Sequence, residues 1–209
     1  MTKVLLTRHG HVEGIKPERF RGREQLELTA RGRAEAQALA RRIAGAWRPR
    51  KVYTSPMGRC VATADAIASA CGVSAQICDD FTDIDYGAWQ FKTFDEAKAL
   101  DPVLFATWFA APHLVEFPNG ESLQQVAARA ANVLRLMLRQ HPDDTIVLVG
   151  HDSTNRALLV QLLDQPLSAF WRVAQTPCCL NEIDINRGKT CVQRINETAH
   201  LEGSSGRDF

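Results

Sequence analysis

The apolar positions of this chain fall into short continuous runs that alternate with longer stretches of helical periodicity. The short runs are typical of buried strands, and they cover Val4–Thr7, Val52–Thr54, Ala75–Cys78 and Ile146–Val149. Two later strands are expected at Asn181–Ile185 and Thr190–Ile195, joined by a hairpin turn at 186–188. This alternation predicts an α/β fold in three layers, with a mostly parallel sheet flanked by helices and one antiparallel edge.

The helical stretches begin at recognisable capping residues. Thr29 precedes a stripe of apolar residues at helical spacing, and Ser122 with Gln125 forms a capping box for a helix over 122–139. Two more helices are expected over Pro56–Ala70, with the proline in the first turn, and over Ser153–Leu163.

The middle of the chain, residues 81–120, is irregular and rich in aromatic residues and prolines. We expect it to be a small insertion that caps the carboxyl-terminal edge of the strands, within a single domain spanning residues 1–200. The segment 201–209 is rich in glycine and serine, and we expect a disordered tail there.

Composition narrows the class of protein. The chain has 209 residues, of which 45% are hydrophobic and 23% are charged, and its net charge is +1. This balance favours neither a nucleic-acid nor a membrane partner. No apolar run approaches the roughly 20 residues that span a bilayer, and a strand that starts by Lys3 leaves no room for a signal peptide. We therefore expect a cytoplasmic monomer or homodimer. The six cysteines lack metal-binding spacing and are expected to be free thiols.

Candidate chemistry gathers where three of the predicted strands end. Arg8, His9 and Gly10 end the first, Arg59 follows the second, and His151 ends the fourth. In an open parallel sheet, ligands bind at the carboxyl ends of the strands. A neutral imidazole among fixed guanidinium groups suits a phosphoryl group, and a glycine lets the backbone approach it closely.

In this order, Arg-His-Gly, Ser55-Pro-x-x-Arg-x-x-x-Thr-Ala64 and Gly-His resemble the motifs of the histidine phosphatase superfamily, also called the phosphoglycerate mutase-like fold. The resemblance runs from Lys3 to about Ile195 and includes Leu28-Thr29-x-x-Gly32-x-x-x-Ala36, Pro118-Asn-Gly-Glu-Ser122 and Arg156. It implies that His9 is phosphorylated and that Arg8, Arg59 and His151 form the phosphate pocket. It also implies that a carboxylic acid protonates the leaving group and that no metal or organic cofactor is required.

The proton donor is where the chain departs from the family. Small bacterial members carry a glutamate where Asp83 stands here, in the run Phe81–Phe91. His151 is followed by Asp152, which resembles the acid phosphatase and phytase branch, where that aspartate is the donor. We expect Asp83 to be the donor, with Asp152 and then Asp85 as alternatives.

The resemblance implies a metal-independent phosphomonoesterase acting on a small phosphorylated metabolite. Phosphoglycerate mutase and α-ribazole phosphatase are the enzymatic alternatives, and a non-catalytic phospho-ligand-binding module is the alternative of another class. Ile15 stands where mutases carry asparagine, and the segment 91–120 holds only Lys92, Lys98 and His113 as cations. Both observations favour hydrolysis. The aromatic insertion suggests a partly hydrophobic substrate, unless its rings form a core. The substrate and the roles of Cys178 and Cys179 are left open.

Overall fold

A computed structural model describes residues 1–202, in which six strands form one sheet. The strands are β1 (Thr2–Arg8), β2 (Lys51–Thr54), β3 (Ala75–Ile77), β4 (Thr145–Gly150), β5 (Leu180–Asn186) and β6 (Lys189–Glu197). Their order across the sheet is β3-β2-β4-β1-β5-β6. The first four strands pair in parallel, whereas β5 runs antiparallel to both β1 and β6. The expected mostly parallel α/β sheet with one antiparallel edge is confirmed.

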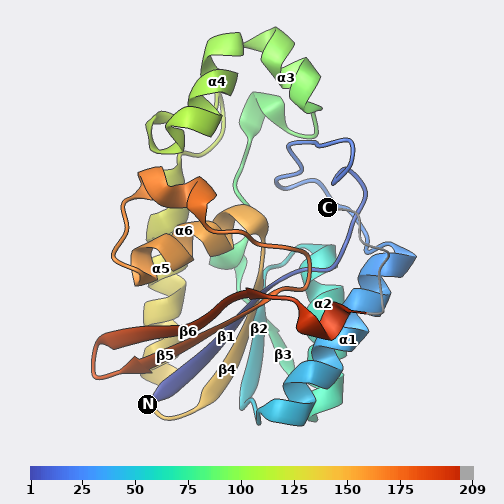
Figure 1. Cartoon of the computed structure of the whole chain (residues 1–209), viewed down its shortest axis with the longest axis vertical. Coiled ribbons are helices and arrows are strands. Elements are labelled where there is room, and N and C mark those ends of the chain that lie inside the picture. Colours follow the sequence, from blue (N-terminus) through green and yellow to red (C-terminus); the bar gives the residue numbers. More distant parts are fainter. Residues whose placement is uncertain (203–209) are drawn as a thin grey trace.

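Four α-helices cover the faces of this sheet and two lie in the insertion. The four are α1 (Ala30–Ala46), α2 (Gly58–Cys71), α5 (Leu123–Gln140) and α6 (Asp152–Leu162), and the two are α3 (Phe94–Leu100) and α4 (Pro102–Ala110). Helices α1 and α2 pack together on one face, and α5 and α6 pack on the other (Figure 1). The resulting three layers leave the carboxyl ends of the parallel strands uncovered by either pair of helices.

The capping residues act as the sequence indicates, with one difference in a helix boundary. The Thr29 hydroxyl accepts a hydrogen bond from the Gly32 N–H at the start of α1, and α5 begins with the expected capping box. Helix α2, however, begins at Gly58 and not at Pro56, so that expectation is wrong by two residues. The reason is a turn in which the Ser55 hydroxyl accepts a hydrogen bond from the Met57 N–H.

The insertion shares a third hydrophobic core with α5 and α6 beyond the end of the sheet. Helices α3 and α4 stand above the main body in Figure 1, with α4 followed by a short 3-10 turn at Pro112–Leu114. Trp89, Trp108 and Phe117 are buried there and pack ring against ring. These aromatic residues therefore form a core, so the rings named here are no evidence for an apolar substrate.

The expectation of a disordered tail over 201–209 is wrong at the first residue of that segment. Leu201, expected to begin a disordered tail, is buried against the α1–α2 side of the sheet. The rest of the expected tail, residues 203–209, lies outside the described residues. All six cysteines are free thiols, as expected. Over residues 1–202, no helix has the length and apolar character that crossing a membrane requires.

Candidate active site

Three neighbouring parallel strands, β2, β4 and β1, deliver the candidate residues to one place. Arg8 is the last residue of β1, His9 follows it, and His151 follows β4. Arg59 comes from the first turn of α2, which follows β2. The strand order places these ends side by side at the edge where open α/β sheets bind ligands. The structure thus brings together the two histidines and two arginines that the sequence singles out.

His9 is held in one orientation by its own backbone. Its Nδ1 lies 2.7 Å from the Gly10 carbonyl oxygen, and its Nε2 lies 3.2 Å from Nε of Arg59. A carbonyl only accepts and a guanidinium only donates, so Nδ1 carries the proton and Nε2 presents its lone pair. Burial, Arg59 and Arg8 lower the pKa of His9 well below its ordinary value. The ring is therefore neutral and able to attack through Nε2.

Arg59 is fully buried, and every part of its guanidinium is engaged. Its two Nη atoms donate to the carbonyl oxygens of Glu24 and Gly22, and Nη2 also lies 3.2 Å from the Asp83 carboxylate. The Thr63 hydroxyl, one turn further along α2, accepts a hydrogen bond from the Gly10 N–H. These contacts fix a permanent positive charge beside the nitrogen that can attack.

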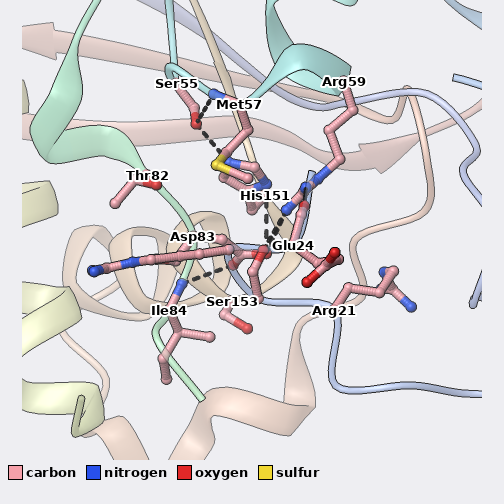
Figure 2. Close-up of polar contacts among 12 residues, drawn as sticks. Arg21, Glu24, Ser55, Met57, Arg59, Thr82, Asp83, Ile84, His151 and Ser153 are labelled. Carbon is pink, nitrogen blue, oxygen red and sulfur yellow. Dashed lines mark hydrogen bonds and ion pairs between the residues drawn. The ribbon is translucent and has the colours of Figure 1, made fainter. Parts of the chain in front are cut away.

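Asp83 projects from the irregular segment after β3 and lies between Arg59 and His151 (Figure 2). Its Oδ2 is 3.2 Å from Arg59 Nη2 and 3.5 Å from His151 Nδ1, and its Oδ1 accepts a hydrogen bond from the Ile84 N–H. Burial raises the pKa of Asp83, and Arg59 with the Ile84 N–H offsets only part of the rise. A carboxyl group with a raised pKa is suited to donate a proton.

His151 faces His9 across the site, with ring centroids 5.3 Å apart. Its Nε2 lies 2.7 Å from the Ser55 hydroxyl, and Nδ1 points toward Asp83. Burial, Arg59 and His9 lower the pKa of His151 well below its ordinary value. A hydroxyl can act as donor or acceptor, so the Ser55 hydroxyl can donate to Nε2 of His151. His151 can then keep its proton on Nδ1, the nitrogen that lies beside Asp83.

Asp152 is engaged in a different network. Its carboxylate lies 2.9 Å from Arg156 Nε and 3.7 Å from Arg8 Nη1. Burial acts to raise the pKa of Asp152, but Arg8 and Arg156 outweigh it and hold the pKa below its usual range. Asp85, the third carboxylate considered, pairs with Arg23 and accepts a hydrogen bond from the Gly87 N–H. Of the three, only Asp83 lies beside both Arg59 and His151.

Buried polar groups that were not predicted from the sequence hold the Arg8 side chain in place. Its Nη1 donates to the Gln175 carbonyl oxygen at 2.5 Å, and the Gln175 side chain bonds to those of Asn155 and Asn181. Nε of Arg8 is buried without a hydrogen-bond partner within residues 1–202. A buried unpaired donor costs free energy, and an anion bound at this edge would supply its partner.

A second missed residue is Arg21, in the loop between β1 and α1. Arg8 and Asp152 are among the charges that most influence it. The sequence offers no periodic signal for it, because arginines stand at positions 19, 21 and 23 of one polar loop. Only the folded loop shows that the charges of Asp83 and Asp152 influence the pKa of Arg21. No cluster of three or more His, Cys, Asp or Glu side chains able to hold a metal occurs in the described part of the chain.

Gly10 accepts the hydrogen bond from His9 through its backbone carbonyl, and its lack of a side chain meets a second requirement. A Cβ at position 10 would lie 2.5 Å from the Gly32 carbonyl oxygen at the start of α1. We therefore expect Gly10→Ala to lower the free energy of unfolding by about 1–3 kcal/mol through overpacking. Urea unfolding measures the loss. Gly45→Ala is the control, because a Cβ there meets nothing within 4 Å. An unchanged midpoint for Gly10→Ala would contradict the expected clash.

Comparison with known proteins gives consistent matches. Residues 4–198 match the family model of the histidine phosphatase superfamily (branch 1). The chain is 31% identical over 201 residues to phosphoserine phosphatase 1 of Hydrogenobacter thermophilus, covering 96% of this chain and 95% of that protein. It is 27% identical over 164 residues to a metal-independent phosphoserine phosphatase of Arabidopsis thaliana, covering 78% of this chain and 69% of that one.

A solved structure extends the similarity to the fold. YhfR of Bacillus stearothermophilus superposes with a TM-score of 0.91 at 27% identity, covering 96% of this chain and 100% of the other. The similarity therefore includes the insertion as well as the sheet.

Proposed function

Because this chain belongs to the histidine phosphatase superfamily (branch 1) and is a phosphoric monoester hydrolase, we propose that it cleaves a small phosphorylated metabolite through a phosphohistidine at His9. The observation that carries this proposal is the unprotonated Nε2 of His9 beside the Arg59 guanidinium. Nε2 attacks phosphorus, and the bond from phosphorus to the ester oxygen breaks. Asp83, in its protonated form, donates a proton to that oxygen, so the leaving group departs as an alcohol and the phosphoryl group stays on His9.

The second half of the reaction returns every group to its starting state. The Asp83 carboxylate takes a proton from water, the water oxygen attacks phosphorus, and the bond to His9 Nε2 breaks. Arg8, Arg59 and His151 hold the non-bridging oxygens, where each hydrogen bond to the charged group contributes roughly 1.5–3 kcal/mol. Phosphoryl transfer depends on positioning and charge stabilisation, which this buried set supplies.

Hydrolysis is favoured over phosphoryl transfer between substrates. Ile15 packs against the hydrophobic core and offers no hydrogen bond to a phosphate oxygen. The two relatives compared by sequence are both phosphoserine phosphatases, so phosphoserine is the first substrate to test. A panel of phosphorylated metabolites with a free-phosphate readout tests the proposal. A mutase assay primed with 2,3-bisphosphoglycerate and an assay on α-ribazole phosphate test the two alternatives. Release of phosphate from no compound would reject the proposed function.

We expect activity to survive removal of metal ions. The arginines supply the positive charge that a divalent cation would otherwise provide. The purified protein is dialysed against EDTA and assayed with and without added Mg²⁺, Mn²⁺ or Zn²⁺, and the rate should change by less than about twofold. Loss of activity that one of these ions restores would contradict the metal-independent mechanism. A cytoplasmic location, a monomeric or dimeric state and the lack of nucleic-acid or membrane partners stay predictions from charge and sequence pattern.

A further inference from the structure

The segment that carries Asp83 has no regular structure to hold it in place. It follows a 3-10 turn at Asp79–Phe81, and residues 82–86 belong to no helix or strand. The carbonyl oxygens of Thr82 and Asp83 accept hydrogen bonds from side chains, because no helix or sheet supplies them with a backbone partner. The side chains that fix this stretch of main chain therefore also fix where the Asp83 carboxyl lies.

Arg129, on α5, bonds to the main chain on both sides of Asp83. Its Nη1 donates to the carbonyl oxygens of Asp80 and Thr82 at 2.9 and 2.6 Å, and its Nη2 donates to the carbonyl oxygen of Asp83 at 3.0 Å. The Thr82 and Asp83 carbonyls belong to the two peptide groups that flank the Cα of Asp83. One guanidinium thus holds both peptide groups between which the Asp83 side chain projects.

Glu121 fixes the Arg129 guanidinium in turn. Its carboxylate accepts hydrogen bonds from Nε at 3.1 Å and from Nη2 at 3.0 Å, the paired geometry in which a planar guanidinium meets a carboxylate. With the three carbonyl oxygens, Arg129 donates five hydrogen bonds, as many as a guanidinium has N–H groups. Glu121 also accepts a hydrogen bond from the Asp85 N–H, so it anchors the main chain beyond Asp83 as well.

Two other side chains bond to the same carbonyl oxygens, and each reaches one of them. The Thr154 hydroxyl donates to the Thr82 carbonyl oxygen at 2.9 Å. Nε of Arg23 donates to the Asp83 carbonyl oxygen at 3.3 Å, from a side chain that is 39% exposed, whereas that of Arg129 is 15% exposed. Within residues 1–202, Arg129 is therefore the side chain that ties the two peptide groups together.

We propose that Arg129 is a positioning residue for the proton donor. Its guanidinium sets the place of the Asp83 carboxyl beside Arg59 and His151, and it acts through Asp83 rather than on the substrate. This inference rests on the proposed function and adds a residue outside the phosphate pocket. A lysine would keep the positive charge but present its donors from a single nitrogen, so it could not span Glu121 and the two flanking carbonyls.

Arg129→Lys should therefore impair proton donation far more than phosphate binding. For an alkyl phosphate that the wild type hydrolyses, phosphoserine being the first to test, kcat should fall by about 10- to 100-fold, as expected when a reacting group is displaced by about 1 Å. For p-nitrophenyl phosphate it should fall by less than about threefold, because nitrophenolate leaves without a proton. KM should change little for either substrate, since Arg8, Arg59 and His151 keep their own contacts.

The ratio of the two losses is insensitive to folding. Both rates are measured on one preparation, so an unfolded fraction lowers them equally and leaves their ratio unchanged. Arg135→Lys is the matched control on the same helix, because Arg135 is exposed and bonds to the Asn132 side chain. This control should leave both rates and their ratio at the wild-type values.

A double variant tests whether Arg129 acts through Asp83. Adding Arg129→Lys to Asp83→Asn should cause no further loss of kcat on the alkyl phosphate, because the proton that Arg129 positions is already absent. Losses that multiply in the double variant would overturn the inference, and so would equal losses on the two substrates in Arg129→Lys. A wild-type protein that releases phosphate neither from p-nitrophenyl phosphate nor from any compound of the panel would instead reject the proposed function itself.

Discussion

Replacing His9 by alanine should lower kcat by about 10³- to 10⁶-fold, the range seen when a covalent nucleophile is removed. The expected loss is large because Nε2 of His9 is the nitrogen with an available lone pair that Arg59 orients. Substrate binding should change much less, since Arg8, Arg59 and His151 remain in place. Steady-state kinetics on p-nitrophenyl phosphate give both quantities.

Covalent labelling tests the same role more directly. Rapid quenching of the wild-type protein with a ³²P-labelled substrate should trap a label that is lost in acid and retained in alkali, the behaviour of a phosphorylated imidazole. Peptide mapping should place that label on His9 and find none in His9→Ala. His11→Ala is a matched control, because the His11 ring bonds to the Thr29 hydroxyl and lies outside the proposed machinery. Full activity in His9→Ala would reject the phosphohistidine mechanism.

The residues at the strand ends could be predicted from the sequence because their position follows from the fold class alone. Arg8, His9 and His151 adjoin apolar runs that form neighbouring strands, and a parallel sheet brings their carboxyl ends together. The capping residues that begin α1 and α5 could be predicted as well, since a cap acts within four residues along the chain. Both inferences depend on local pattern.

The roles of residues that depend on neighbours distant in the sequence could not be predicted from local pattern. Asp83 and Asp152 are both aspartates near a histidine in space or sequence, and their protonation depends on which arginines face them. Arg156 lies one helical turn after Asp152 and helps to lower its pKa, which keeps Asp152 ionised. Burial raises the pKa of Asp83, and the neighbouring Arg59 offsets only part of that rise. Arg21 belongs to a loop without periodicity, so only the folded loop shows which charges influence it.

The pH dependence of the reaction follows from these two shifted groups. His9 must be neutral to attack, and its lowered pKa keeps it neutral well into the acid range. Asp83 must be protonated to donate, and its raised pKa extends the protonated form toward higher pH. The rate should therefore rise with pH through the lowered pKa of His9 and fall with pH through the raised pKa of Asp83.

Replacing Asp83 by asparagine should reveal a loss that depends on the leaving group. Hydrolysis of an alkyl phosphate such as phosphoserine should slow by about 10²- to 10⁴-fold, because an alkoxide is a poor leaving group without a proton. Hydrolysis of p-nitrophenyl phosphate should slow far less, since nitrophenolate departs unprotonated. The falling limb of the pH profile for the alkyl substrate should also disappear. Parallel measurement of kcat on both substrates over a pH series gives the ratio of the two losses.

Asp152→Asn is the matched control for this prediction, because it makes the same exchange of a carboxyl group for an amide at a residue that contacts Arg8 and Arg156. Asp152 pairs with Arg156 and Arg8, so we expect its loss to raise KM similarly for both substrates through altered phosphate binding. A loss dependent on the leaving group in Asp152→Asn, without one in Asp83→Asn, would reverse the assignment. Equal losses on both substrates in Asp83→Asn would instead indicate that Asp83 positions Arg59 and His151. The contrast between the two variants separates proton donation from phosphate binding. Both exchange a carboxyl group for an amide of the same shape, and of the two only Asp83 has a raised pKa and lies beside Arg59 and His151.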